Sequence, residues 1–139
     1  MDDKIKGDDK LTILAVDDNS ISLATIEQEF KGTYEVVALN SGVRALQYLK
    51  QQTPPDLILL DIQMAPKDGI ETLREIREME KCAGLPVIML TSQREKQNIL
   101  ESSKLGINDY VLKPFKTQDL HDRIERVLKS EMEKRLENR

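Results

Sequence analysis

Five side chains with metal-binding or phosphoryl-binding chemistry each follow a short apolar run of the sequence. They are Asp17, Asp18, Asp61, Thr91 and Lys113. Three carboxylates gathered at one point repel one another and need a hard divalent cation, for which oxygen atoms are suitable ligands. Mg²⁺ is the natural candidate, and Mn²⁺ is a chemically similar substitute. The lysine and the threonine hydroxyl would then contact the oxygens of a phosphoryl group.

The formal charges of this set indicate what phosphorylation would change. The three carboxylates are balanced by Mg²⁺ and Lys113, so the resting site is neutral. An acyl phosphate on Asp61 would carry a charge of about −2, which leaves the site negative. The new oxygens need further hydrogen-bond donors, and Thr91 offers a hydroxyl. The charges therefore predict that modification pulls the Thr91 loop inward.

The apolar runs before these side chains predict strands of one parallel sheet. They are rich in Val, Ile and Leu with little polar alternation, which favours strands buried on both faces. The runs are 11–16, 57–60, 87–90 and 110–112, and a less purely apolar run, 34–39, predicts a strand nearer the edge. Parallel strands would bring the five side chains to the carboxyl edge of the sheet, where open α/β sheets bind ligands.

Segments with helical spacing alternate with these runs. They are roughly 20–30, 42–51, 68–81, 94–104 and 117–136, and their order predicts an α/β fold of five strand–helix units. In the first helix, Ile21, Ala24, Ile26 and Phe30 are expected to form much of the buried face.

Composition favours a single soluble domain. The 139 residues include 21 Lys and Arg against 25 Asp and Glu, so nothing indicates a nucleic-acid surface. No apolar stretch approaches the roughly 20 residues that span a bilayer. Residues 1–10 are charged, lack the apolar core of a signal peptide and are expected to form a mobile polar tail. The single cysteine, Cys82, agrees with a reducing compartment, and we expect a cytoplasmic location.

Four motifs occur in the order and at the separations of one known family. They are Asp17-Asp18-Asn19, Asp61 to Met64 with Asp68-Gly69, Thr91-Ser92, and the segment 106–115. With these motifs, residues 11–128 resemble the receiver domain of bacterial two-component response regulators, the CheY-like superfamily. The resemblance implies a flavodoxin-like three-layer sandwich, (βα)5, with a five-stranded parallel sheet in the order 2-1-3-4-5.

The resemblance also implies a phosphorelay function. Asp61 would take a phosphoryl group from the phosphohistidine of a sensor histidine kinase or a histidine phosphotransfer protein. Asp18, Asp61 and the backbone carbonyl of Gln63 would bind Mg²⁺ directly, while Asp17 would act through water. Lys113 would pair with the phosphoryl oxygens.

Other residues would transmit or modulate the signal in the same family. Thr91 would close on the phosphoryl group while Tyr110 packs inward, which would switch the face made by helix 94–104, strand 110–112 and helix 117–136. As an alternative, Tyr110 fits an ordinary core aromatic. A homodimer through that face is a further hypothesis. The modulating residues would be Ser92, Gln63 and Gln93. Ser92 is a small residue beside the phosphoryl site, and the two glutamines flank the path by which water approaches the phosphoryl group.

Three sequence features bear on how far the resemblance extends. Ala65 precedes Pro66 where the family usually has proline directly, although the loop length is kept, and a cis peptide bond is expected before Pro114. Residues 129–139 extend the last helix beyond the domain. Along the whole last helix, the apolar residues that recur every four positions are Leu120, Ile124, Leu128, Met132 and Leu136. This stripe fits either a coiled-coil linker to an output domain or a solvated helix.

Three other functions fit the sequence less well. A hydrolase of the haloacid dehalogenase kind needs a second Asp two residues after its nucleophile, and Asp17-Asp18-Asn19 lacks that spacing. A flavin or nucleotide binder would need a Gly-rich or Ser/Thr-rich phosphate loop there. A receiver that binds partners without phosphorylation is expected to lose site residues, and all five are present. We therefore predict a signalling switch and not an enzyme that acts on a metabolite.

Overall fold

Five short strands form one parallel sheet in the computed structural model, which describes residues 10–92 and 96–138. The strand order is β2-β1-β3-β4-β5, as predicted. The strands are β1 (Thr12–Val16), β2 (Glu35–Leu39), β3 (Leu57–Asp61), β4 (Val87–Thr91) and β5 (Asp109–Leu112). The predicted tail falls mostly on residues 1–9, which lie outside the described residues.

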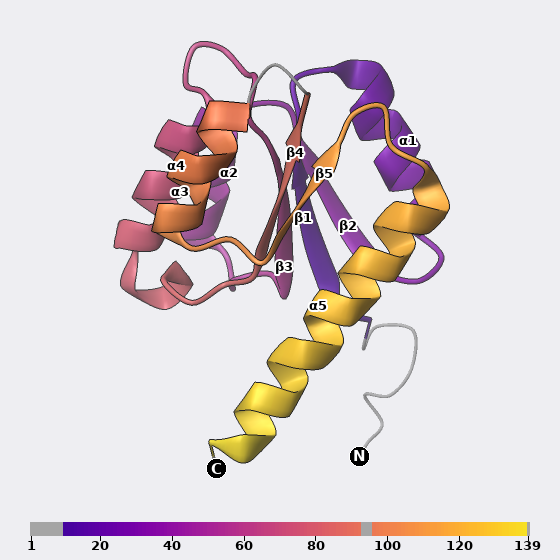
Figure 1. Ribbon diagram of the computed structural model, residues 1–139, viewed down its shortest axis with the longest axis vertical. Coiled ribbons are helices and arrows are strands. Elements are labelled where there is room, and N and C mark those ends of the chain that lie inside the picture. Colours follow the sequence, from indigo (N-terminus) through magenta and orange to yellow (C-terminus); the bar gives the residue numbers. More distant parts are fainter. Residues whose placement is uncertain (1–9, 93–95, 139) are drawn as a thin grey trace.

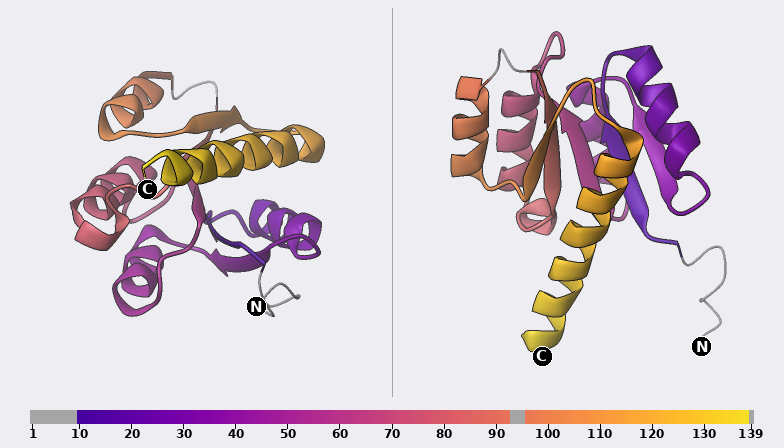
Figure 2. Two further views of the ribbon diagram at one scale, coloured as in Figure 1. Left: turned by 90° about the horizontal axis from the view of Figure 1, so that it is seen from below. Right: turned by 45° about the vertical axis from the view of Figure 1, so that its right-hand side comes forward.

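Five α-helices cover both faces of this sheet. They are α1 (Ser20–Phe30), α2 (Gly42–Gln51), α3 (Gly69–Glu78), α4 (Lys96–Leu105) and α5 (Thr117–Glu137), with a 3-10 helix, η3 (Glu80–Cys82), after α3. Helices α2, α3 and α4 lie on one side of the sheet and α1 and α5 on the other, which makes the predicted three-layer sandwich (Figures 1 and 2). The helix predicted over 68–81 ends early because the backbone of Met79 is extended (φ −80°, ψ 123°).

Alternate strand residues feed two separate cores. Leu14 and Leu60 pack with residues of α2 and α3, whereas their neighbours Ile13 and Leu59 pack with residues of α1 and α5. Both sets are buried because successive side chains of a strand point to opposite faces of the sheet. The three inner strands are therefore held from both sides, which fixes the positions of their carboxyl ends.

Strand β5 departs from the prediction of a strand buried on both faces. Only Val111 of this strand is buried, while Tyr110 and Leu112 are 42% and 39% exposed. The reason is position, since β5 forms an edge of the sheet and has one neighbouring strand. The alternative interpretation of Tyr110 as a core aromatic is therefore wrong.

The buried face of α1 also differs from the expected one. Ile26 and Phe30 are fully buried, but Ile21 is 76% exposed and Ala24 is exposed as well. At about 100° per residue, Ile21 lies about 140° around the helix from Ile26, so the two side chains cannot share one face. Ile21 remains in solvent although it is apolar.

Helix α5 is the longest element and extends past the end of the sheet (Figure 1). Its first half packs on the sheet through buried residues such as Leu120 and Ile124. Its last turns carry Met132 and Leu136, which are 53% and 64% exposed. Among the described residues, no helix is long and apolar enough to cross a membrane.

Candidate phosphoryl and metal site

Three carboxylates meet at the carboxyl edge of the sheet, as the parallel-strand prediction expected. Asp17 and Asp18 directly follow β1, and Asp61 is the last residue of the neighbouring strand β3. One carboxylate oxygen from each residue lies within 4.8 Å of the others. This arrangement supplies the hard oxygen ligands that Mg²⁺ or Mn²⁺ prefers.

Asp17 is fully buried and is held from two directions. Its Oδ1 atom accepts a hydrogen bond from the backbone N–H of Asn19 at 2.9 Å, and its Oδ2 atom accepts one from Lys113 Nζ at 2.7 Å. Asn19 also begins α1, because its side chain accepts a hydrogen bond from the N–H of Ser22. The turn after β1 therefore fixes Asp17 and starts the helix at the same time.

Asp18 contrasts with Asp17 in its surroundings. It is exposed, and no hydrogen bond or ion pair joins its side chain to another residue of the described ranges. Its carboxylate oxygen nevertheless lies in the cluster with Asp17 and Asp61. Of the three carboxylates, Asp18 is thus the one that a cation could reach without displacing a protein donor.

Lys113 lies between the two buried carboxylates. Its Nζ atom is 2.7 Å from Asp17 Oδ2 and 3.4 Å from Asp61 Oδ2. The peptide bond from Lys113 to Pro114 is cis. The side chain of Lys113 reaches the site from the end of β5. Its positive charge is therefore shared between Asp17, which follows β1, and Asp61, which ends β3.

The electrostatic environment of Asp61 favours its neutral form when no metal ion is bound. Burial and the negative charge of Asp17 raise the pKa of Asp61 to about 7, although Lys113 acts in the opposite direction. A carboxyl group in this situation gains from a nearby divalent cation, because the cation favours the ionised form. The donor set therefore fits a hard metal ion.

The loop after Asp61 is folded back tightly on the strand. The N–H of Gly69 donates to the carbonyl of Ile62 at 2.8 Å, and a Cβ atom at Gly69 would overlap the backbone oxygen of Asp61. Asp68 and Glu71 form a capping box at the start of α3. At the position where the sequence departs from the family, the bond between Ala65 and Pro66 is also cis. Gln63 is exposed beside the site.

The residues predicted to act as a switch lie at the end of β4 and in β5. Thr91 is buried, and its hydroxyl donates to the carbonyl of Ser92 at 3.2 Å. The N–H of Lys113 donates to the carbonyl of Thr91 at 2.7 Å, which ties the two strand ends together. Tyr110 is exposed and borders a surface hollow that also contains Arg123. Gln93 lies outside the described residues.

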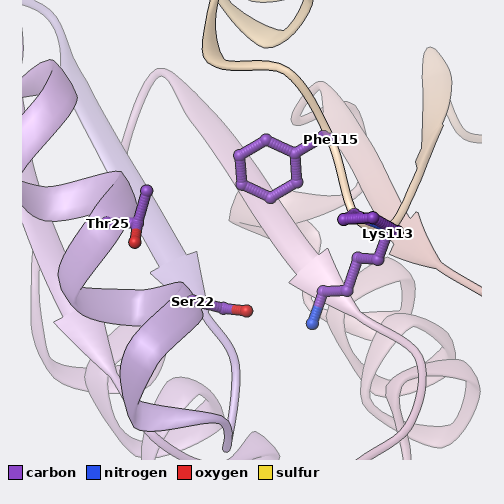
Figure 3. A pocket seen from close by; sticks show the side chains of 5 residues that line it. Ser22, Thr25, Lys113 and Phe115 are labelled. Carbon is purple, nitrogen blue, oxygen red and sulfur yellow. The ribbon is translucent and has the colours of Figure 1, made fainter.

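A second hollow opens directly beside Lys113 and was not anticipated from the sequence. It has a volume of about 350 Å³ and is lined by Ser22, Thr25, Lys113, Pro114 and Phe115. Figure 3 shows Ser22 and Thr25 on α1 facing Phe115 and Lys113 across this space. Helical spacing could have indicated that Ser22 and Thr25 share one face of α1, since residues three apart do so. Only the fold shows that the loop after Lys113 lies opposite this face.

Comparisons with known proteins point to one family. Residues 13–125 match the model of the family described as response regulator receiver domain. The transcriptional regulatory protein ZraR of Escherichia coli K12 is 34% identical over 121 residues, which are 86% of this chain and 27% of that protein. A chemotaxis protein CheY homolog of Campylobacter jejuni is 29% identical over 120 residues, which are 85% of the chain and 92% of the homolog. The chain thus spans about a quarter of ZraR.

A solved structure gives the same result for the fold. The receiver domain of the sensor histidine kinase PA1611 from Pseudomonas aeruginosa is 31% identical and superposes with a TM-score of 0.76. The match covers 86% of this chain and 98% of that domain, which was crystallised with a magnesium ion coordinated in its active site cleft.

Proposed function

Because the chain belongs to the family of response regulator receiver domains, we propose that Asp61 accepts a phosphoryl group from a phosphohistidine in a step that depends on Mg²⁺. The donor is a sensor histidine kinase or a histidine phosphotransfer protein. The observation that carries this proposal is the position of Asp61, whose carboxylate lies among two other carboxylates and beside Lys113. The chain is a signalling switch and not an enzyme that turns over a metabolite.

In the proposed transfer, one carboxylate oxygen of Asp61 attacks the phosphorus atom. An acyl phosphate bond forms, the phosphorus–nitrogen bond of the phosphohistidine breaks, and the imidazole nitrogen keeps the electron pair. Asp61 must be ionised to attack, and its raised pKa means that the metal-free site holds much of this residue in the unreactive neutral form at neutral pH. Lys113 lies close enough to contact the phosphoryl oxygens once they are present.

The proposed metal ligands are the carboxylates of Asp18 and Asp61 and the backbone carbonyl of Gln63, with Asp17 acting through water. Bound Mg²⁺, or Mn²⁺ in its place, would neutralise charge on the carboxylates and on the incoming phosphoryl oxygens. The hydrogen bonds from Asn19 and Lys113 to Asp17 support its indirect role. Both of its oxygens already have protein donors.

The proposed switch runs from Asp61 to the face made by α4, β5 and α5. Thr91 would close on the phosphoryl oxygens, and the exposed Tyr110 would then pack inward. Gln63, Ser92 and Gln93 would modulate how long the acyl phosphate survives. We further propose that this face contacts the downstream partner or a second copy of the chain. The protein would act in the cytoplasm. Residues 11–128 would form the receiver domain, and residues 129–139 a linker toward any output domain.

The direct test is the intact mass of the chain after incubation with a small phosphodonor and Mg²⁺. We expect one base-labile phosphate adduct in the wild-type protein. The adduct should be absent in Asp61→Asn and in samples that contain a chelator. Asp122→Asn is a matched control, because Asp122 is exposed on α5 and is not part of the carboxylate cluster, and this variant should be phosphorylated normally.

The outcomes separate two kinds of receiver. An adduct that needs both Asp61 and the metal ion supports the phosphoacceptor function. An adduct on Asp61→Asn would show that another residue is modified. If neither small donors nor a kinase domain phosphorylates the wild-type chain, the proposal fails in favour of a module that binds partners without phosphorylation.

A further inference from the structure

Helix α4 is the least buried helix on its side of the sheet. Of its described side chains, those of residues 97–105, only Ser102 is buried, and Leu100 is 67% exposed. Ser102 is polar and its hydroxyl donates to the carbonyl of Asn98 within the same helix. Apolar contact, which holds most surface helices in place, is therefore sparse along α4, although the partly buried Leu105 in its last turn packs against the core that α2 and α3 share.

Arg77, near the end of α3, adds polar attachments at the same end of α4. Its Nε atom donates to the carbonyl of Leu105 at 3.2 Å, and its Nη2 atom donates to the carbonyl of Gly106 at 2.6 Å. These carbonyls lie at the C-terminal end of α4, where a helix leaves backbone oxygens without partners. Gly106 has a left-handed backbone conformation (φ 91°) that ends the helix there.

The same guanidinium also fixes the segment that follows α3. Its Nη1 atom donates to the carbonyls of Cys82 and Ala83, each at 3.2 Å. Among the described residues no carboxylate forms an ion pair with Arg77, although the charge of Glu131 acts on it, and its hydrogen bonds go to backbone oxygens. A planar guanidinium with five N–H groups suits this arrangement, and a lysine ammonium does not. Helices α3 and α4 lie side by side (Figure 2).

The opposite end of α3 is attached to the phosphoacceptor. The N–H of Gly69 donates to the carbonyl of Ile62, the residue after Asp61, and no side chain separates the two backbones. Helix α3 therefore connects the Asp61 loop with the C-terminal end of α4. The N-terminal end of α4 follows Thr91 in the chain, so its two ends are coupled to different parts of the site.

We propose that Arg77 is a positioning residue that fixes the C-terminal end of α4 to α3, so that α4 pivots about this end when Thr91 closes on phosphorylated Asp61. The anchoring itself depends only on the contacts of Arg77. The pivot rests on the proposed function. The pivot has the consequence that phosphorylation moves the beginning of α4, on the face made by α4, β5 and α5, and leaves the last turn of α4 in place.

The test of the anchor is amide hydrogen exchange of the unphosphorylated chain. Arg77→Gln should speed exchange at Leu105 and Gly106 by roughly tenfold or more, because bonds to a charged donor are lost at the helix end. Arg74→Gln is the matched control, since Arg74 also joins α3 to α4 through an exposed pair with Glu101 at 3.1 Å. It should change exchange at these amides by less than about threefold.

Two results would overturn the anchor. One is unchanged exchange at the end of α4 in Arg77→Gln, and the other is an equal rise in every strand and helix, which would indicate general destabilisation. Arg77→Lys provides a milder variant in case the glutamine variant unfolds. It keeps the charge but not the planar group, so we expect a smaller rise in exchange at the same amides.

The test of the pivot adds a small phosphodonor and Mg²⁺ to the wild-type chain. Exchange should change at residues 97–100 and stay constant in the last turn of α4, and in Arg77→Gln it should change along the whole helix. A uniform change along α4 in the wild-type chain would overturn the pivot. Intact mass on the same samples separates the two proposals. An absent adduct would overturn the proposed function and the pivot with it, whereas the unphosphorylated samples decide the anchor alone.

Discussion

At the scale of single residues, one lysine offsets part of the negative charge of the carboxylate cluster. Lys113 contacts Asp17 and also lies near Asp61, so it competes with a divalent cation for the same carboxylates. The apolar run before Lys113 predicted its place at the correct edge of the sheet. Its contact with Asp17, 96 residues away in the chain, follows only from the fold.

We therefore predict that Lys113→Ala binds Mg²⁺ more tightly than the wild-type chain, by about tenfold. The reason is that the variant removes a positive charge that repels the metal ion and occupies Asp17 Oδ2. Titration calorimetry with MgCl₂ in low-salt buffer would measure the affinity. Lys116→Ala is the control, because Lys116 is exposed and forms no ion pair among the described residues. Equal or weaker binding by Lys113→Ala would contradict the prediction.

The raised pKa of Asp61 predicts how stability depends on pH in metal-free buffer. In the unfolded chain this carboxyl ionises near its ordinary pKa of 3.8, whereas in the folded chain it ionises at about 7. Between these values the folded state binds more protons, so the free energy of unfolding falls as the pH rises and levels off above about 7. Urea denaturation with a chelator at about pH 6 and about pH 7.5 would measure the change.

Asp61→Asn isolates this contribution, because asparagine does not titrate. The difference in unfolding free energy between the wild-type chain and this variant should shift in favour of the variant as the pH rises. Saturating Mg²⁺ should reduce the shift, since a bound cation favours the ionised carboxylate. A wild-type chain that gains stability relative to the variant over this pH range would show that the pKa of Asp61 is not raised.

At the scale of secondary structure, short-range patterns predicted which elements form. Apolar runs indicated the five strands and helical spacing indicated the five helices, since both patterns depend on neighbours in the chain. Burial of individual faces was predicted less well. The exposure of Tyr110 and Leu112 depends on the position of β5 at the edge of the sheet, and the exposure of Ile21 depends on its angle around α1. Both follow from where the residue lies on its element or in the sheet and not from residue type.

The contact between α3 and the Asp61 loop leads to a prediction about Gly69. A Cβ atom at this position would overlap the backbone of Asp61 and Ile62, so Gly69→Ala should lower the free energy of unfolding by about 2–3 kcal/mol. Urea denaturation would measure the loss. Gly84→Ala is the matched control, because a Cβ atom there would meet no atom of a non-adjacent residue within 4 Å, and it should have little effect. Equal losses in both variants would contradict the steric explanation.

At the scale of the whole molecule, the last helix leaves the domain gradually. Apolar residues recur every four positions along α5, and at about 100° per residue each step turns the stripe by about 40°. Leu120 at the start of the stripe is fully buried, Leu128 is 7% exposed and Leu136 is 64% exposed. The stripe thus turns away from the sheet along the helix. Its end borders an apolar hollow of about 300 Å³ with Leu11 and Tyr34.

This winding predicts different costs for the same substitution at two positions of the stripe. Leu128→Ala should lower the free energy of unfolding by about 2–4 kcal/mol, because it empties a packed site. Leu136→Ala should cost less than about 0.5 kcal/mol, because its side chain is largely in solvent. Urea denaturation compares the two, and light scattering after size exclusion gives the mass of each sample. A large loss in Leu136→Ala together with a wild-type dimer that this variant dissociates would favour the coiled-coil interpretation. A monomer with a neutral Leu136→Ala would favour the solvated helix, since a seam that drifts by about 40° per step does not stay against a straight partner helix.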